Sequence, residues 1–260
     1  MNKIFSLRLN HLVGVFLITF WPHHSFGQPG PAVSAPNEVE YFIAYFSDPN
    51  FEVKKEVFGE LEFSGITDTR LFDIVEQRFI ETSKLKGMKN VDDAAWLGKA
   101  LSYSGQDKYL QTLNEARQST RNTTFIKHLK LSIERLPQFT NWDKELVKNT
   151  EGLTGEELYR QRTVNMINAA DSYLSMVGAR RVWFHHPTDA QYIKVVSEKL
   201  QAEYNKSDLS RRDIDAIGWY CNVLGKSEDS SYKPILDKIA PDSSNGRIRN
   251  YAKKNSRLLK

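Results

Sequence analysis

The sequence predicts an all-α protein that contains two related halves. From Asn37 onward, apolar residues recur at the spacing of amphipathic helices, and no convincing run of period-two strands interrupts them. The stretch WLGKALSYSGQDKYLQTL, from Trp96, shares Trp, Leu, Ser, Tyr and Leu with WYCNVLGKSEDSSYKPIL, which begins 123 residues later at Trp219. Just upstream, TDTRLFDIVEQRF from Thr67 pairs with TDAQYIKVVSEKL from Thr188. A repeated multi-helix unit accounts for these observations together.

The apolar periodicity predicts six helices in each half. In the first half we expect helices at 38–47, 51–63, 68–84, 92–103, 107–118 and 122–136. In the second half we expect them at 155–177, 178–184, 189–204, 211–224, 230–239 and 246–259. Residues that favour helix starts agree with several of these bounds, namely Asp68, Asp92 with Asp93, Asp189 and Ser210.

The match at an offset of 123 continues without a gap to the end of the first half. It pairs Leu101 with Leu224, Ser104 with Ser227, Tyr109 with Tyr232, Asn122 with Asn245 and Leu136 with Leu259. The upstream match has an offset of 121, and the difference falls in polar segments, where insertions cost little. We therefore assign residues 37–137 to the first half, 138–154 to a linker and 155–260 to the second half.

Smaller units are also visible within each half. DPNFEVKKEVFGEL places Val53, Val57 and Leu61 on one helical face, and SSNGRIRNYAKKNSRLL places Ile248 and Ala252 likewise. These segments resemble the second helix of HEAT-like repeats of the short bacterial type. The resemblance implies a right-handed alpha-alpha superhelix with a concave face, in which Trp96 and Trp219 fill the core or the space between repeats.

The N-terminus predicts export. Lys3 and Arg8 precede an apolar run from Leu12 to Trp21, and small residues follow, which is the order of a secretory signal peptide at 1–27. The run is about half of the roughly 20 residues needed to cross a bilayer, so we expect no transmembrane helix in the mature chain. Residues 28–36 predict a flexible linker.

Cysteine usage indicates the cellular compartment, and the net charge argues against one class of partner. Cys221 is the only cysteine and has no partner for a disulfide within the chain, which favours the periplasm of a Gram-negative bacterium over a secreted eukaryotic setting. Without residues 1–27, 34 basic and 32 acidic residues remain. The mature chain is close to neutral, and we expect no nucleic-acid partner.

The strongest metal candidate is VWFHHPTD, which contains His185, His186 and Asp189. Adjacent histidines point in different directions on most backbones, and the mature chain contains no HExxH motif. Structural or solvated histidines are the favoured interpretation. Gly-rich phosphate loops, a G-x-S-x-G elbow and paired cysteines are also absent, so we expect no metal, no cofactor and no catalytic residue.

Both ends of the mature chain offer candidate partner surfaces. The terminal segment is basic, and we expect Arg247, Arg249, Lys253 and Lys254 either to be solvated on a final helix or to meet an anionic surface.

The helix at 38–47 is apolar on most sides. Tyr41, Phe42, Tyr45 and Phe46 therefore either pack against the next helix or dock a partner.

We interpret the chain as a noncatalytic exported HEAT-like repeat protein that acts as a protein-protein interaction scaffold in the periplasm and binds a protein of the cell envelope. One alternative is an envelope-surface binder that uses the basic C-terminal helix on anionic lipid or glycan. Another is an enzyme whose site, with residues such as His185, His186 and Asp189, lies in the concave groove.

Overall fold

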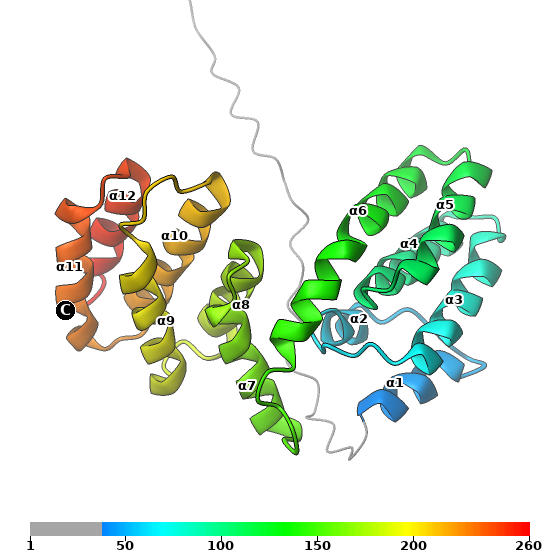
Figure 1. The fold of residues 1–260 in the computed structure, drawn as a ribbon, viewed down its shortest axis with the longest axis horizontal. Coiled ribbons are helices and arrows are strands. Elements are labelled where there is room, and N and C mark those ends of the chain that lie inside the picture. The colour runs from blue at the N-terminus through cyan, green and yellow to red at the C-terminus, as the bar shows by residue number, and fades with distance from the viewer. Residues whose placement is uncertain (1–37) are drawn as a thin grey trace, which may run out of the picture.

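The computed structural model describes residues 38–260, and this range contains helices and no strand (Figure 1). The predicted all-α class is therefore confirmed. Helices α1–α6 form one end of an elongated molecule and α9–α12 form the other, with α7 and α8 between them (Figure 1). The predicted signal peptide at 1–27 and the flexible linker at 28–36 lie outside the described residues.

Twelve α-helices and two short 3-10 helices lie within residues 38–260. The first six α-helices are α1 (Glu38–Ser47), α2 (Lys55–Glu62), α3 (Thr69–Ser83), α4 (Met88–Tyr103), α5 (Leu110–Ser119) and α6 (Thr123–Leu146). The second six are α7 (Gly155–Asn168), α8 (Ser172–His185), α9 (Ala190–Glu203), α10 (Arg211–Lys226), α11 (Lys233–Asp242) and α12 (Gly246–Ser256). The 3-10 helices are η1 (Asp107–Tyr109) and η2 (Ser230–Tyr232).

Helix bounds recur at the offset that the sequence indicates. α4 and α10 both contain 16 residues and are displaced by 123, as are η1 and η2 and the ten-residue helices α5 and α11. The N-caps recur as well. Asn122 accepts from the N–H of Phe125 at 3.0 Å, and Asn245 accepts from the N–H of Arg247 at 2.9 Å.

The C-terminal ends of α4 and α10 also share the same hydrogen bonds and backbone conformation. Ser104 Oγ donates to the carbonyl of Leu101 at 2.8 Å, and Ser227 Oγ donates to the carbonyl of Leu224 at 2.7 Å. The next residue adopts a left-handed backbone in both copies, with φ of 61° at Gly105 and 62° at Glu228. Ser104 and Ser227 are therefore equivalent residues that end α4 and α10 in the same way.

The predicted boundary at residue 136 is wrong, because α6 continues through Pro137 to Leu146. Proline cannot donate an N–H within a helix and usually disfavours its continuation. Here the helix continues because Phe139, Trp142 and Leu146 extend the buried face. The first part of the segment expected to be a linker, 138–154, is thus helical and packed.

The predicted boundary between residues 177 and 178 is also wrong. The chain breaks at Ala169–Asp171 instead, where Asp171 caps α8 by accepting from the N–H of Leu174 at 2.8 Å. Gly178 lies inside α8, and a Cβ there would lie 2.8 Å from the backbone N of Ile167 on α7. The glycine therefore allows two helices to approach closely, and does not end one.

Two helix starts differ for local reasons. α2 begins at Lys55, because the Tyr45 hydroxyl accepts from the N–H of Lys54 and donates to the carbonyl of Glu52, which holds the preceding segment outside the helix. α4 begins at Met88, so Asp93 lies in its second turn, where its carboxylate pairs with Lys89 at 2.6 Å.

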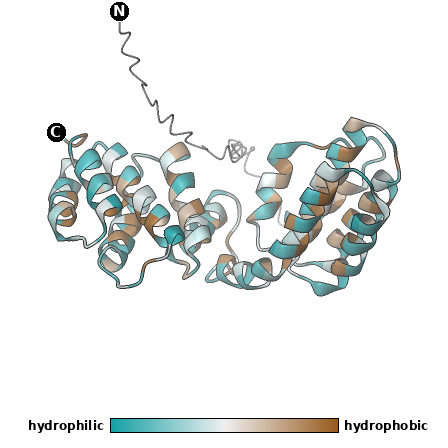
Figure 2. Cartoon of the chain, turned by 90° about the horizontal axis from the view of Figure 1, so that it is seen from above, coloured by the Kyte–Doolittle hydropathy of each residue, from teal (hydrophilic) through white to brown (hydrophobic). Residues whose placement is uncertain are grey.

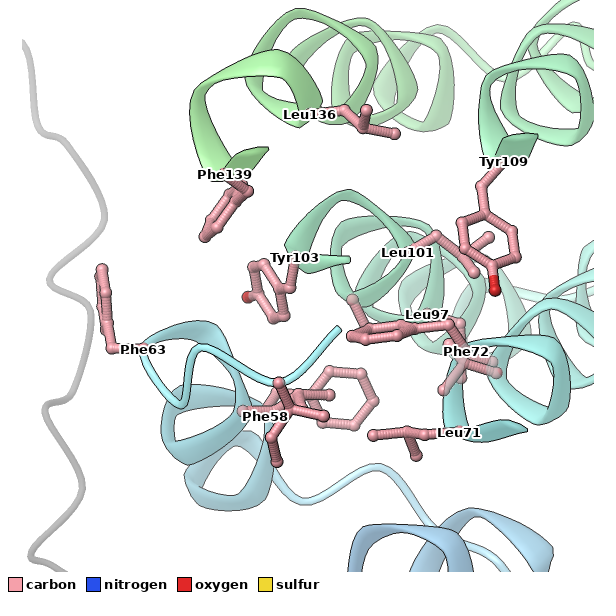
Figure 3. Packing of buried hydrophobic residues seen from close by; sticks show 14 of the residues in the cluster. Phe58, Phe63, Leu71, Phe72, Leu97, Leu101, Tyr103, Tyr109, Leu136 and Phe139 are labelled. Atoms are coloured by element: carbon pink, nitrogen blue, oxygen red, sulfur yellow. The ribbon is translucent and has the colours of Figure 1, made fainter. Parts of the chain in front are cut away.

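The core consists of two apolar clusters that meet at α7 and α8. Hydrophobic and hydrophilic residues are interspersed along every helix, as amphipathic helices require (Figure 2). The first cluster joins α1–α6 around residues such as Phe58, Leu97 and Tyr103 (Figure 3). Met166 on α7 belongs to it, whereas the neighbouring Ile167 belongs to the second cluster, which extends to Leu259. The α7–α8 pair therefore contributes to both clusters.

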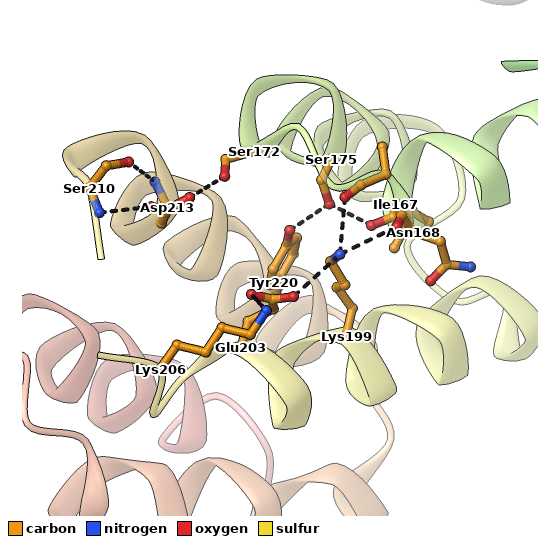
Figure 4. A network of polar contacts seen from close by, with 11 residues as sticks. Ile167, Asn168, Ser172, Ser175, Lys199, Glu203, Lys206, Ser210, Asp213 and Tyr220 are labelled. Carbon is orange, nitrogen blue, oxygen red and sulfur yellow. Dashed lines mark hydrogen bonds and ion pairs between the residues drawn. The ribbon is translucent and has the colours of Figure 1, made fainter. Parts of the chain in front are cut away.

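A polar network secures the end of α7 (Figure 4). Ser175 Oγ contacts both the carbonyl of Ile167 and the hydroxyl of Tyr220 at 2.5 Å. Lys199 Nζ donates to the carbonyl of Ala169 at 3.0 Å and pairs with Glu203 at 3.4 Å. These bonds satisfy carbonyls that the end of a helix leaves without an intrahelical donor.

Within residues 38–260, every helix is too short or too polar to span a lipid bilayer. For this part of the chain, the finding agrees with the predicted absence of a transmembrane helix.

The repeated helix end provides a paired stability test. A Cβ at Gly105 would lie 2.6 Å from the backbone N of Thr140, so Gly105→Ala adds a steric clash to left-handed strain and should cost about 2–4 kcal/mol. Glu228→Gly relieves the same strain and should stabilise by about 0.5–1 kcal/mol. Urea unfolding of both variants checks this; a destabilised Glu228→Gly would contradict it.

Asp143 provides a pH test. This carboxyl group is 5% exposed, its Oδ2 has no hydrogen-bond partner among the described residues, and burial raises its pKa from 3.8 to about 8. The folded state therefore holds this proton more tightly than the unfolded state, so its contribution to stability falls as the pH rises from about 4 to about 8.

Asp143→Asn removes this titration. Between pH 5 and pH 7, wild type should lose about 1 kcal/mol per pH unit relative to the variant, since one pKa unit corresponds to about 1.4 kcal/mol. Urea unfolding across this range measures the difference. Parallel profiles for the two proteins would show that Asp143 does not titrate in this window.

Candidate functional site

A row of aromatic rings and cations crosses α4, α6, α8 and α10. We call it the ring–cation band, and its members are Trp96, Lys99, Arg135, Tyr173, Arg180, Trp183, Trp219 and Lys226. The band begins on α4, where Lys99 Nζ lies 5.1 Å from the centroid of the Trp96 ring. Such contacts between a cation and an aromatic face are attractive and orient the cation.

Glu62 on α2 connects the first cations of the band. Its side chain is 4% exposed, and Oε2 lies 2.9 Å from Lys99 Nζ and accepts from the Tyr103 hydroxyl at 3.2 Å. Arg135 on α6 lies 3.9 Å from Oε1. Burial, and then the Glu62 charge, raise the pKa of Tyr103 well above 10, so Tyr103 remains a neutral donor. Two cations surround one carboxylate, which leaves this end of the band positive.

The band continues onto α8 and α10 through Tyr173. The Arg135 guanidinium lies 5.6 Å from the Tyr173 ring, and that ring stacks on Trp142 at 5.5 Å. Arg180, about two turns further along α8, lies 5.2 Å from the Trp219 ring on α10. Burial lowers the pKa of Arg180, and the nearby Tyr173 opposes this effect.

The band ends at an aromatic pocket between α8, α10 and α12. The rings of Trp183 and Trp219 meet edge to face at 5.8 Å, and Phe184 meets Trp183 in the same way at 4.6 Å. Lys226 Nζ lies 4.0 Å from the Trp183 ring and donates to the Trp183 carbonyl at 3.0 Å.

The cavity beside these rings has a volume of about 430 Å³, within the range of pockets that bind small ligands. Its lining residues are Trp183, Trp219, Asn222, Gly225, Lys226, Glu228, Lys254, Asn255 and Leu258.

The basic C-terminal residues have different roles. Arg247 pairs with Asp215 at 2.7 Å, and Arg249 donates to the carbonyls of Ser243 and Ser244, so both serve the fold. Lys253 and Lys254 are exposed and make no hydrogen bond or ion pair with another described residue.

Of these four basic residues, Lys254 alone lines the pocket.

The N-terminal aromatics pack mainly inside the molecule. Phe42 and Phe46 are at most 1% exposed, and Phe46 meets Phe58 of α2 at 5.5 Å. Tyr41 and Tyr45 are half-buried, and the Tyr45 hydroxyl is used in the loop after α1. These four side chains therefore do not form an exposed apolar face.

His185, His186 and Asp189 lie near one another but serve different contacts. Asp189 caps α9 and pairs with Arg160 at 2.7 Å, whereas the His186 ring packs against Tyr192 at 5.2 Å. Burial lowers the pKa of both histidines, and for His186 the Asp189 charge opposes this effect. No group of three metal-binding side chains occurs within residues 38–260.

The sequence interpretation missed most of the band. Trp96 and Trp219 were expected only as fillers, and both are half-buried with a cation on the ring. The cations lie on different helices, so their spacing in the sequence carries no regular signal. The band and its pocket offer apolar ring faces together with N–H donors, which suits an anionic ligand with an apolar part.

In comparisons with known proteins, no family model matches the chain, and no curated protein matches it either.

The pKa of His186 tests the electrostatics of this region. In Asp189→Asn, the cap can persist because asparagine is a good capping residue, but the charge that raises the His186 pKa is lost. The pKa of His186 should therefore fall further, while that of His185, which Asp189 affects only through the charge of His186, should change less. An NMR pH titration of the ring protons measures both pKa values. Equal changes in the two pKa values would contradict a direct effect of the Asp189 charge on His186.

Proposed function

We propose that this protein is a noncatalytic, exported scaffold that binds a protein partner in the periplasm of a Gram-negative bacterium. We further propose that its helices form a right-handed superhelix of HEAT-like repeats. The recurrence of helix bounds at an offset of 123 supports the second proposal. The first depends on the ring–cation band.

The composition of the band favours a protein partner. Trp, Tyr and Arg are the residue types that most often dominate the binding energy of protein interfaces, and the band contains all three. Contacts with Glu62 and with the ring faces hold its cations in place, which reduces the entropy lost on binding. An extended, positively charged row of this kind suits an extended partner of opposite charge.

The two alternatives receive less support from the contacts. A surface binder that uses the C-terminal helix would need Arg247 and Arg249, and both are engaged within the molecule. An enzyme that uses Asp189 would need its carboxylate, which caps a helix and pairs with Arg160. The scaffold remains the function that the band favours.

The scaffold predicts a partner whose capture depends on the band. Residues 28–260 should retain one stoichiometric envelope protein at high salt, whereas Trp96→Leu with Arg135→Gln should weaken its binding at least about tenfold, or about 1.4 kcal/mol. Both substitutions lie at the α4–α6 end of the band. The measurement is affinity capture followed by titration of the purified partner.

A control variant separates a local effect from a change in net charge. Lys84→Gln with Lys194→Gln removes two exposed cations outside the band, one more than the band variant removes, and should still bind as wild type does. Thermal unfolding of each variant verifies that it folds. Equal binding by the band variant, or recovery of only anionic lipid or glycan that is lost at high salt, would contradict the scaffold.

A further inference from the structure

One difference between the two copies is the surface next to the end of α4 and α10. At the offset of 123, the pocket residues Trp219, Lys226 and Glu228 correspond to Trp96, Tyr103 and Gly105. In the first copy, this surface is covered by the second half of α6. Its Phe139 ring meets Tyr103 at 5.1 Å.

Thr140 of α6 also lies against the residue that follows α4. The hydroxyl of Thr140 donates to the carbonyl of Gly105 at 2.6 Å, and a Cβ at Gly105 would lie 2.6 Å from Thr140 N. In the second copy, α12 ends at Ser256, which corresponds to Ile133, and within residues 38–260 no helix takes the place of the second half of α6. By this correspondence, the pocket of about 430 Å³ is lined by counterparts of Tyr103 and Gly105, which the first copy covers with its own helix.

The structure assigns this pocket to a peptide segment of a partner protein that carries an aromatic residue beside a carboxylate and takes the place that the second half of α6 fills in the first copy. This assignment rests on the proposed scaffold function and names the class of its partner. The aromatic residue corresponds to Phe139, and the carboxylate meets the charge that Lys226 introduces where the first copy has Tyr103.

The walls of the pocket match this occupant. Trp183 and Trp219 supply ring faces, and two of the exposed large apolar side chains, Phe184 at 46% and Leu258 at 58%, lie beside them. An exposed apolar group at a rimmed pocket is typical of an interaction site. An aromatic side chain placed there gains the edge-to-face contacts that the two rings already make with each other.

The charges also match it. Lys226 is fixed by its bond to the Trp183 carbonyl and keeps further N–H donors, while Lys254 on α12 is exposed on the rim. Among the described residues that line the pocket, Glu228 is the single acid beside two lysines, which leaves an excess of positive charge. A carboxylate beside the anchor complements the two lysines.

A saccharide fits less well, because its hydroxyl groups need many hydrogen-bond partners when they leave water. Both N–H donors of the Asn255 amide are already used, because Nδ2 donates to Asn222 Oδ1 and to the Tyr251 carbonyl, each at 2.9 Å. A flat membrane surface would not fill a recess. The observations therefore favour a peptide.

The chain itself supplies the probe. A synthetic peptide with the sequence of residues 138–146, QFTNWDKEL, carries the aromatic and acidic residues of the segment that covers the first copy. One control peptide replaces its Phe and Trp with Ala, and a second replaces its Asp and Glu with Asn and Gln. Binding to residues 28–260 is followed by NMR on the indole N–H signals of the protein.

We expect the probe to shift the indole signals of Trp183 and Trp219 more than that of Trp96, and both control peptides to bind at least about tenfold more weakly. Lys226→Gln with Lys254→Gln should weaken binding of the probe by a similar factor. Lys84→Gln with Lys194→Gln should leave binding of the probe unchanged. No response at about 1 mM probe, or equal binding of the Ala peptide, would overturn the assignment.

Two further outcomes separate this assignment from the scaffold itself. Binding of polygalacturonate or of phosphatidylglycerol vesicles that depends on Lys226 and Lys254, without binding of the peptide, would overturn the peptide in favour of that ligand. Partner capture that is lost in Trp96→Leu with Arg135→Gln but unchanged in Lys226→Gln with Lys254→Gln would overturn the pocket and leave the scaffold. Binding of the peptide without capture of any partner would overturn the scaffold and leave the pocket as a peptide-binding site.

Discussion

The close approach of α7 and α8 is the constraint on which the rest of the molecule depends. Each helix has one apolar face, which only a neighbouring helix can cover. Gly178 allows α8 to lie against the backbone of Ile167, and this pair contributes side chains to both core clusters. α8 also carries Tyr173, Arg180 and Trp183, so the contact that joins the two cores positions the middle of the ring–cation band.

Electrostatics explains why the cations of the band stay in place. A buried carboxylate without partners would be costly, and the donors around Glu62 offset that cost. Because two cations surround one acid, compensation of the buried charge leaves a surplus of positive charge at the surface. The same contacts that stabilise the fold therefore create the potential that an anionic partner would meet.

Periodicity and the repeat predicted the helical class, the order of the helices and several caps, because these depend on residues close in sequence. The helix ends predicted at residues 136 and 177 were wrong, because α6 continues through Pro137 to bury Phe139, and Gly178 lies inside α8 where it approaches α7. The candidate site was less predictable. Lys254 was identified from the basic terminal segment, whereas Arg180 and Lys226 gain their roles from rings on another helix, a relation that no spacing along the chain encodes.

The continuation of α6 through Pro137 also has a mechanical consequence. Proline has no N–H, so the carbonyl of Ile133 lacks the intrahelical bond that the other turns have, and the longest helix is least stiff there. Packing offsets this loss on both sides of the proline, because Leu136 before it and Phe139 and Trp142 after it belong to the same core cluster. Contacts with side chains of other helices, and not the hydrogen bonds of α6 alone, therefore keep this helix continuous up to the loop before α7.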